Sequence, residues 1–353
     1  MRNERQVKKS KTPLYISIVV ACVLIMTSLF LPLPYYIEMP GSADDVQQFV
    51  TVDGQKNEHT GAYLLTTVGI RQATPLTLLT AKFNDFQEVE TKEALFGDNN
   101  SEEYDLIGQL QMSSSENMAK KVALDLAKEP YTFVYEGVFI HSVVEGSDFE
   151  GKLKVGDVVY KVDEHSFDSS EQFMTYVKGK KLGESVTLTI KRDDKTMEIS
   201  GKLIKLPATK NIGIGITLSD KTSLESDRKI AFEVEDIGGP SAGLMFTLEI
   251  YEGLIGQSLR NGHIIAGTGE IKSNGDVGMI GGIDKKIVAA DQAGADIFFA
   301  PSEEYPEDVL KEAPDLKNNY EIAKEAAKKI KTDMKIVPVK NVKEALAYLE
   351  TLK

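Results

Sequence analysis

An uncharged apolar run near the N-terminus constrains the arrangement of this chain more than any other feature. The 18 residues from Leu14 to Leu31 carry no charge, and residues 1–11 before them contain five basic residues and one acidic residue. A helix needs roughly 17–25 apolar residues to cross a bilayer, and basic residues mark its cytoplasmic side. We therefore predict a cytoplasmic N-terminus over 1–12, a transmembrane anchor over 13–34 and later residues outside the membrane.

A cleavable signal peptide is the alternative interpretation of this run. Its apolar core is usually shorter, about 7–15 residues, and small residues mark its cleavage site. Here the run leads into Tyr35 and Tyr36, which are typical of a membrane interface, and no Ala-x-Ala follows closely. The length and the aromatic pair favour a retained single-pass anchor in the cell membrane, with the later domains extracytoplasmic.

Composition and charge exclude several classes of function. The only cysteine, Cys22, lies inside the apolar run, so no intrachain disulfide can form and thiol or metal-cluster chemistry is disfavoured. We expect no cofactor and no metal. The net charge is −13, and because residues 1–11 carry +4 the remainder carries −17. Such a surface repels a phosphate backbone, so we expect no nucleic-acid partner.

Three further segments follow, and together they predict an α+β fold. Residues 35–130 mix strand-like runs with an amphipathic helix that Ser115 would cap. They carry no chemical motif, so we expect a membrane-proximal spacer that packs against later domains. Residues 131–206 alternate strand patterns with glycine turns around one helix at about 169–177. Residues 210–353 contain a serine motif, a lysine motif and a hairpin signal at Asn274-Gly275.

The middle segment resembles a bacterial PDZ domain. The resemblance rests on GVFI at 137–140 and on EGSDFEGKLKVGDVVYKVD at 145–163. It implies a domain that holds an extended peptide as an added strand. The peptide-binding loop would be formed by Gly137, Val138, Phe139 and Ile140. The alternative is a small β-rich domain without a ligand.

The stretch IGGPSAGLMFTLEIYEGL, residues 237–254, allows two roles for Ser241. Two glycines and a proline permit a sharp turn and leave N–H groups free at a helix start, where the helix dipole favours negative charge. Serine is also a favoured helix cap, so the motif alone does not identify a nucleophile. A nucleophile needs a base. Of the four histidines only His263 lies within residues 210–353, in a polar turn, and no pattern places it beside Ser241.

A lysine 45 residues after the serine is the better candidate base. The glycine pair Gly281-Gly282 leads into a helix that carries Lys285 and Lys286. A lysine at a helix start that is partly desolvated has a depressed pKa and can act as a neutral base. Paired lysines are also typical of a solvated helix face, which is the alternative interpretation.

The motifs GPSAG, TGEI and GGIDKK occur here in the order found in Lon-type proteolytic domains, which residues 210–353 resemble. The resemblance implies that Ser241 is the nucleophile, that Lys286 is the general base and that Thr268 supports the lysine. Our candidates for the oxyanion hole are backbone groups of Gly239, Pro240 and Ser241.

No nucleotide-binding motif G-x-x-x-x-G-K-[ST] occurs in the sequence. The combination of anchor, PDZ segment and Lon-type segment resembles the membrane-anchored PDZ–Lon-type serine protease family of Gram-positive bacteria. That resemblance implies an ATP-independent endopeptidase, without a nucleotide partner, that cleaves extracytoplasmic peptides, unfolded chains or small membrane or secreted proteins. The alternatives are an inactive peptide-binding scaffold and a carrier without a peptidase role. The sequence leaves the oligomeric state open.

Overall fold

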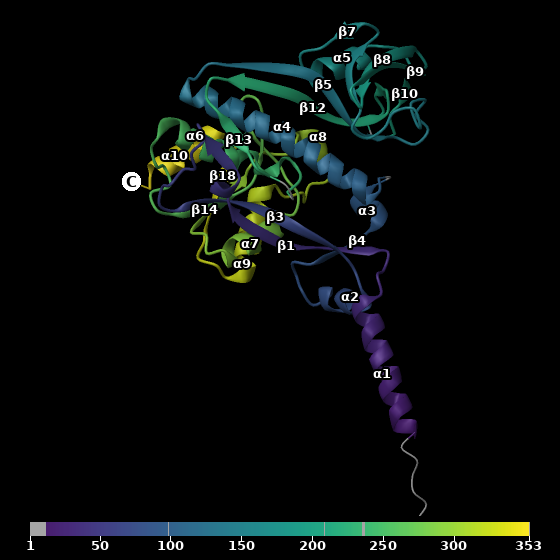
Figure 1. The fold of residues 1–353 in the computed structure, drawn as a ribbon, viewed down its shortest axis with the longest axis vertical. Helices are drawn as coiled ribbons and strands as arrows, with labels where there is room; N and C mark the ends of the chain where they lie inside the picture. Colours follow the sequence, from purple (N-terminus) through teal and green to yellow (C-terminus); the bar gives the residue numbers. More distant parts are fainter. Residues whose placement is uncertain (1–11, 98, 208, 235–236, 353) are drawn as a thin grey trace, which may run out of the picture. The chain divides into compact units, whose positions relative to one another are not determined.

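The computed structural model divides the chain into two compact units (Figure 1). The first unit comprises Met1–Pro40 and Gly69–Gly97, and the second comprises Gly41–Val68 and Asp98–Lys353. The structure describes residues 12–97, 99–207, 209–234 and 237–352.

The first unit consists of short elements around a small core. Its helices are α1 (Thr12–Phe30), α2 (Pro75–Ala81) and α3 (Lys92–Phe96), and β4 (Glu88–Thr91) pairs antiparallel with the start of β1 (Tyr35–Asp45). Thr74 forms a capping box with Thr77, and Pro75 occupies the first helical turn, where its missing N–H costs nothing. Ile37, Ala73 and Ala81 form the buried core of this unit.

The apolar run forms α1, whose side chains from Tyr15 to Phe30 are exposed except for the half-buried Ser28. In the part of the chain that the structure describes, none of the helices is both long and apolar enough to cross a membrane. The anchor over 13–34 stays a prediction, and residues 1–11 of the predicted basic segment lie outside the described residues.

The part of the second unit that contains the predicted PDZ segment, called the PDZ part below, is a sheet with the strand order β12-β5-β6-β8-β9. A buried core that includes Phe149, Phe173 and Leu188 fills one face of the sheet. The predicted helix is present as α5 (Ser170–Lys178), capped by Ser169. The strands are β5 (Tyr131–Val143), β6 (Val158–Val162), β8 (Ser185–Arg192), β9 (Lys195–Lys202) and β12 (Ile216–Ser226), with β7 (His165–Ser166) paired to β6 and a separate pair formed by β10 (Ile204–Lys205) and β11 (Ile212–Gly213).

Two predictions for this part need correction. The segment 131–206 is too short, because β12 lies beyond it and supplies the edge strand of the sheet. The residues 137–140 do not form a peptide-binding loop, because they lie inside β5. Val138 and Phe139 pair with β12 on one side and with β6 on the other. A strand paired on both sides has no free edge to which a peptide can add.

The part that contains the predicted Lon-type segment, called the protease part below, is built on a sheet with the order β18-β17-β14-β3-β1. The first four strands are parallel, and helices lie in the crossovers between them, as parallel pairing requires. Its strands are β3 (Ala62–Gln72), β14 (Ile264–Gly267), β17 (Ile297–Pro301) and β18 (Lys335–Val339), and its helices are α6 (Gly243–Ile255), α7 (Ile283–Gln292), α8 (Glu307–Glu312), α9 (Asn319–Ile330) and α10 (Val342–Glu350).

Short elements complete the second unit. The predicted hairpin is confirmed: β15 (Glu270–Ile271) pairs antiparallel with β16 (Val277–Gly278), and Gly275 has a φ of 86° in the loop between them. The others are the 3-10 turns η1 (Val46–Gln48) and η2 (Pro240–Ala242) and the pair formed by β2 (Val50–Val52) and β13 (Ile230–Phe232).

The helix α4 (Ser101–Ala127), which lies in the segment 35–130 that we expected to pack against later domains, belongs to the folded core. It begins at Asn100, which forms a capping box with Glu103, so the predicted cap Ser115 lies in its interior. Its apolar face packs in one cluster with α6, whose Leu244, Phe246 and Leu248 are fully buried. It also lies beside the long β5–β12 ribbon of the PDZ part (Figure 1). Burial of each large apolar side chain in such a core contributes about 1.5–3 kcal/mol.

A buried ion cluster links two carboxylates of α6 to the segment that follows this helix. The Arg260 guanidinium donates to carboxylate oxygens of Glu249 and Glu252 at 2.9 and 3.0 Å, and the Tyr63 hydroxyl donates to Glu252 at 3.0 Å. Both carboxylates are 2% exposed or less. Oε1 of Glu249 has no hydrogen-bond partner among the described residues. Burial raises the pKa of Glu249 to about 7, against the opposing charge of Arg260.

We expect Glu249→Gln to flatten the pH dependence of stability. The folded state holds the Glu249 proton more tightly than the unfolded state, so the native chain loses stability as pH rises from about 4.5 to about 7. The loss is roughly 2–3 kcal/mol, and glutamine removes it. The measurement is the midpoint of urea unfolding, which circular dichroism monitors at pH 5 and at pH 8. The same dependence of stability on pH in the native chain and the variant would contradict the assignment of the raised pKa to Glu249.

Candidate active site

The turn before Ser241 has a backbone that glycine makes possible. Gly239 has a φ of 88° and a ψ of 162°, a backbone conformation that residues other than glycine rarely adopt. A Cβ on Gly238 would lie 3.0 Å from Cα of Gly108 in α4, so this glycine permits a close backbone approach. Pro240 then starts η2, which continues into α6. Ser241 is thereby held half-buried at the start of the helix.

Lys286 reaches Ser241 from the crossover helix α7. Gly282, with a φ of 64°, starts that helix, and Lys286 is its fourth residue. The lysine is only 4% exposed. Its Nζ lies 2.7 Å from Oγ of Ser241 and 3.0 Å from Oγ1 of Thr268. The structure therefore brings together the predicted serine, lysine and threonine.

Thr268 fixes the relative position of the other two residues. It directly follows β14, at the carboxyl end of a parallel strand, where open sheets commonly place their sites. Its hydroxyl donates to the Ser241 carbonyl at 3.1 Å, and the N–H of Gly269 donates to the same oxygen at 2.8 Å. Because the threonine proton is committed to that carbonyl, its Oγ1 faces Lys286 as an acceptor. That arrangement orients the amine toward Ser241.

Burial gives the lysine the electrostatics of a base. It lowers the pKa of Lys286 from 10.5 to about 7, because a charged ammonium loses its hydration in this environment. A large fraction of the amine is then neutral near pH 7, with a lone pair that can accept the Ser241 proton. The geometry and the pKa together meet the requirements of an activated serine nucleophile.

The neighbouring Lys285 is also buried, at 3% exposed. Its Nζ lies 3.6 Å from a carboxylate oxygen of Asp284. The alternative of a solvated pair of lysines is therefore wrong for both residues. His263 lies 3.5 Å from Asp296 and is 40% exposed at its side chain, as expected of a residue outside the site.

The three oxyanion-hole candidates differ in what they can donate. The N–H of Gly239 already donates to the Gly108 carbonyl at 2.9 Å, and Pro240 has no N–H. The N–H of Ser241 lies in the first turn of η2, where helical N–H groups have no partner within the helix. It is therefore the best placed of the three to bind an oxyanion.

Residues of α4 hold the turn in place, and the sequence did not predict them. The Ser115 hydroxyl donates to the Pro240 carbonyl at 3.0 Å, and Gly108 accepts from Gly239. Both lie more than 100 residues from the turn in a segment without a motif. The one signal in the sequence is Gly108 itself, since a glycine inside a helix costs stability and needs a packing reason.

Two domain families match separate parts of the chain. Residues 107–203 match the PDZ domain, and residues 235–351 match the C-terminal proteolytic domain of Lon protease (S16). The chain therefore contains a PDZ domain and a Lon-type serine peptidase domain. The PDZ match begins inside α4, in agreement with the packing of that helix on β12.

Curated relatives match the proteolytic part. The Lon protease of Metamycoplasma arthritidis is 34% identical over 111 residues, which is 31% of this chain and 11% of the relative. The Lon protease of Ureaplasma parvum is 33% identical over 132 residues, which is 32% of this chain and 16% of the relative. Lon protease 1 of Thermus thermophilus is 40% identical over 80 residues, which is 21% of this chain and 10% of the relative. The chain thus spans 10–16% of the length of these relatives.

Among solved structures, the chain is similar to the PDZ domain of an SdrC-like protein from Listeria monocytogenes. The identity is 34%, the match covers 24% of this chain and 90% of that one, and the TM-score is 0.23. The PDZ assignment rests on the family match and on the strand order.

We expect kcat/KM to rise with pH through an apparent pKa near 7, as Lys286 loses its proton. Lys286→Ala removes the base and should lower kcat/KM by about 10²–10⁴-fold. Lys286→Arg should be as inactive, because arginine stays charged and cannot accept the proton. The measurement is the initial rate of peptide cleavage between pH 5 and pH 9.

Lys285→Met is the matched control, since it removes the adjacent buried amine and should retain most activity. An active Lys286→Arg variant together with an inactive Lys285→Met variant would identify Lys285 as the base. Full activity in Lys286→Ala would exclude the Ser–Lys mechanism.

Proposed function

We propose that the chain is an ATP-independent serine endopeptidase that uses Ser241 and Lys286 as a dyad. The observation that carries this proposal is the 2.7 Å separation between Nζ of a buried lysine and Oγ of a serine at a helix start. Within a Lon-type domain, that pair has the geometry of a nucleophile and its base. The Thr268 hydroxyl keeps the amine aligned.

Lys286 accepts and then releases a proton in each half of the catalytic cycle. Neutral Lys286 takes the Ser241 proton as Oγ attacks the peptide carbonyl, and the N–H of Ser241 binds the oxyanion. When the C–N bond breaks, Lys286 gives this proton to the departing amine and an acyl-serine remains. A water molecule then loses a proton to Lys286 and attacks the acyl carbon. The lysine finally returns the proton to Oγ as the product acid leaves.

The substrates of this activity are peptides, unfolded chains or small membrane or secreted proteins. The 353 residues contain no nucleotide-binding motif, so the proposed cleavage uses no ATP to unfold a folded substrate. The PDZ domain supports docking of an extended segment, because such domains bind peptides as added strands.

The membrane anchor is part of the same proposal. The exposed apolar side chains of α1 support it, because a continuous apolar helix surface is unfavourable in water. The basic residues before the run support an N-terminus in the cytoplasm and catalysis outside it.

We expect the purified chain to cleave a fluorogenic peptide, and Ser241→Ala to lower the rate to the assay background, because alanine removes the attacking oxygen. Release of fluorescence without added ATP is the measurement. Circular dichroism of the variant controls for folding. An inactive native chain would favour the alternative of a peptide-binding scaffold.

We also expect protease added to intact wall-stripped cells to degrade the Lon-type domain, because the charge pattern places residues after 34 outside the membrane. An antibody to the C-terminus reports the loss of the domain, and a cytoplasmic protein serves as the control. Complete protection of the domain would contradict the proposed orientation.

A further inference from the structure

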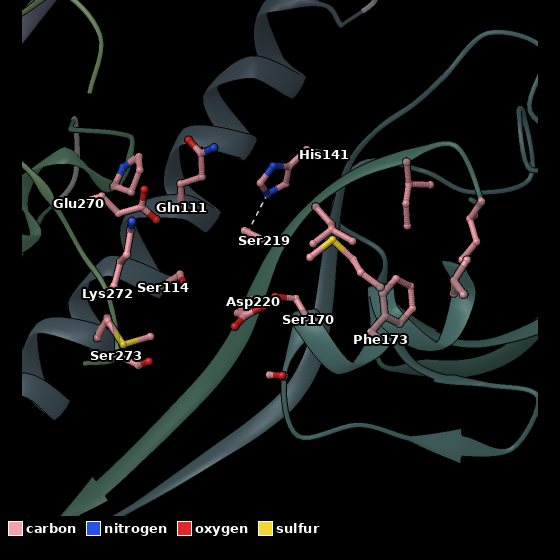
Figure 2. Close-up of a pocket in the computed structure, with 18 of the residues that line it drawn as sticks. Gln111, Ser114, His141, Ser170, Phe173, Ser219, Asp220, Glu270, Lys272 and Ser273 are labelled. Carbon is pink, nitrogen blue, oxygen red and sulfur yellow. Dashed lines mark hydrogen bonds between the residues drawn. The ribbon is translucent and has the colours of Figure 1, made fainter. Parts of the chain in front are cut away.

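A groove of about 760 Å³ lies within the second unit, between the PDZ part and the protease part. Figure 2 shows its walls: α5 and β12 of the PDZ domain, α4, and the segment around Glu270. Its volume falls within the roughly 300–1,000 Å³ typical of ligand sites. Because residues 137–140 have no free strand edge, this groove is the better place for a peptide on the PDZ domain.

The groove extends to the catalytic turn. Its lining includes Pro240, the residue before the nucleophile, and Glu270–Ser273, which follow Thr268 and Gly269. A polypeptide held in the groove therefore extends toward the turn that carries Ser241. Continuity between a docking surface and the attacking atom is what a substrate channel requires.

The PDZ wall of the groove is apolar. Phe173 and Val177 of α5 are buried in the PDZ core and also line the groove. Ile214, just before β12, and Leu218, within β12, line it as well. This wall suits apolar side chains of an extended segment.

One acidic group in the groove is left without a partner. Oδ1 of Asp220 is buried and has no hydrogen-bond partner among the described residues. In Figure 2 it lies on β12, with Ser170 and Phe173 of α5 on one side and Gln111 and Ser114 of α4 on the other. A buried carboxylate oxygen without a donor is costly, so its presence favours a ligand that supplies one.

The other charged groups of the groove leave Asp220 unneutralised. The ammonium group of Lys272 lies 2.8 Å from a carboxylate oxygen of Glu303, which offsets its charge. The ring of His141 hydrogen-bonds Ser219 at 2.8 Å, and burial lowers its pKa, which keeps it neutral. Glu270 adds a second carboxyl group, and the exposed Lys178 lies at the end of α5. The centre of the groove is therefore acidic and lies beside an apolar wall.

We propose that this groove selects substrate segments in which a lysine or arginine is flanked by apolar residues. The basic side chain pairs with Asp220, and the flanking residues pack on Phe173, Val177 and Leu218. The inference rests on the proposed peptidase function, and it specifies which chains that function acts on.

The test measures binding apart from cleavage. Fluorescence anisotropy with the Ser241→Ala chain compares three labelled peptides that carry lysine, norleucine or glutamate at one central position between apolar residues. We expect the lysine peptide to bind about tenfold more tightly than the norleucine peptide, and the glutamate peptide to bind most weakly. Asp220→Asn, which keeps the shape of the side chain, should bring the lysine and norleucine peptides to equal affinity.

The control variant is Asp194→Asn, in the exposed turn between β8 and β9. It removes the same charge at a position outside the groove. It should keep the full preference for lysine. Equal affinity of the lysine and norleucine peptides for the unsubstituted groove, or a preference that survives Asp220→Asn, would overturn the proposal.

The two proposals fail in different ways. Cleavage of a short generic peptide by the native chain reports the Ser241–Lys286 dyad alone. If that peptide is cleaved while the three labelled peptides bind equally, the groove proposal is wrong and the peptidase proposal stands. If the generic peptide is not cleaved but the preference for lysine follows Asp220, the peptidase proposal is wrong and the groove still binds basic segments.

Discussion

The burial of the Lys286 amine beside Ser241 is the interaction on which the site depends. An exposed lysine is almost fully protonated at neutral pH and cannot act as a base, so the chemistry requires a dry environment for this one group. The fold provides it by placing the residue on the inner face of α7, at 4% exposure. The cost of removing an ammonium from water appears as the lowered pKa.

That environment is assembled from distant parts of the chain. Ser241 comes from the start of α6, Thr268 from the end of β14 and Lys286 from α7, and α4 supports the turn from outside. The parallel sheet explains why these three residues meet, since its crossovers bring the end of a strand and the next helix to the same edge of the sheet. The segment 35–130, which lacks a motif, contributes β1, β3 and α4 to this assembly.

The contact between the PDZ and protease parts gives the substrate-binding proposal its physical basis. A PDZ domain on a flexible linker would only raise the local concentration of a substrate. Here α4 packs on α6 and also lies against β12, and the Asn117 amide donates to the Thr222 carbonyl at 2.8 Å. The proposed docking groove and the turn before Ser241 therefore share one wall, and packed helices and strands fix their relative position.

The sequence by itself determined the candidate residues of the site. Ser241, Thr268 and Lys286 stand in short motifs whose glycines and helix starts are local properties, so residue types and spacing were enough to predict them and to predict the PDZ and Lon-type domains. Only the tertiary structure decided which strands enclose residues 137–140, that Ser115 and Gly108 hold the catalytic turn, and where the groove lies. Those features depend on contacts between residues far apart in the sequence, such as Ser115 and Pro240, which are 125 positions apart. Side-chain burial and strand pairing at such separations leave no local pattern in the sequence.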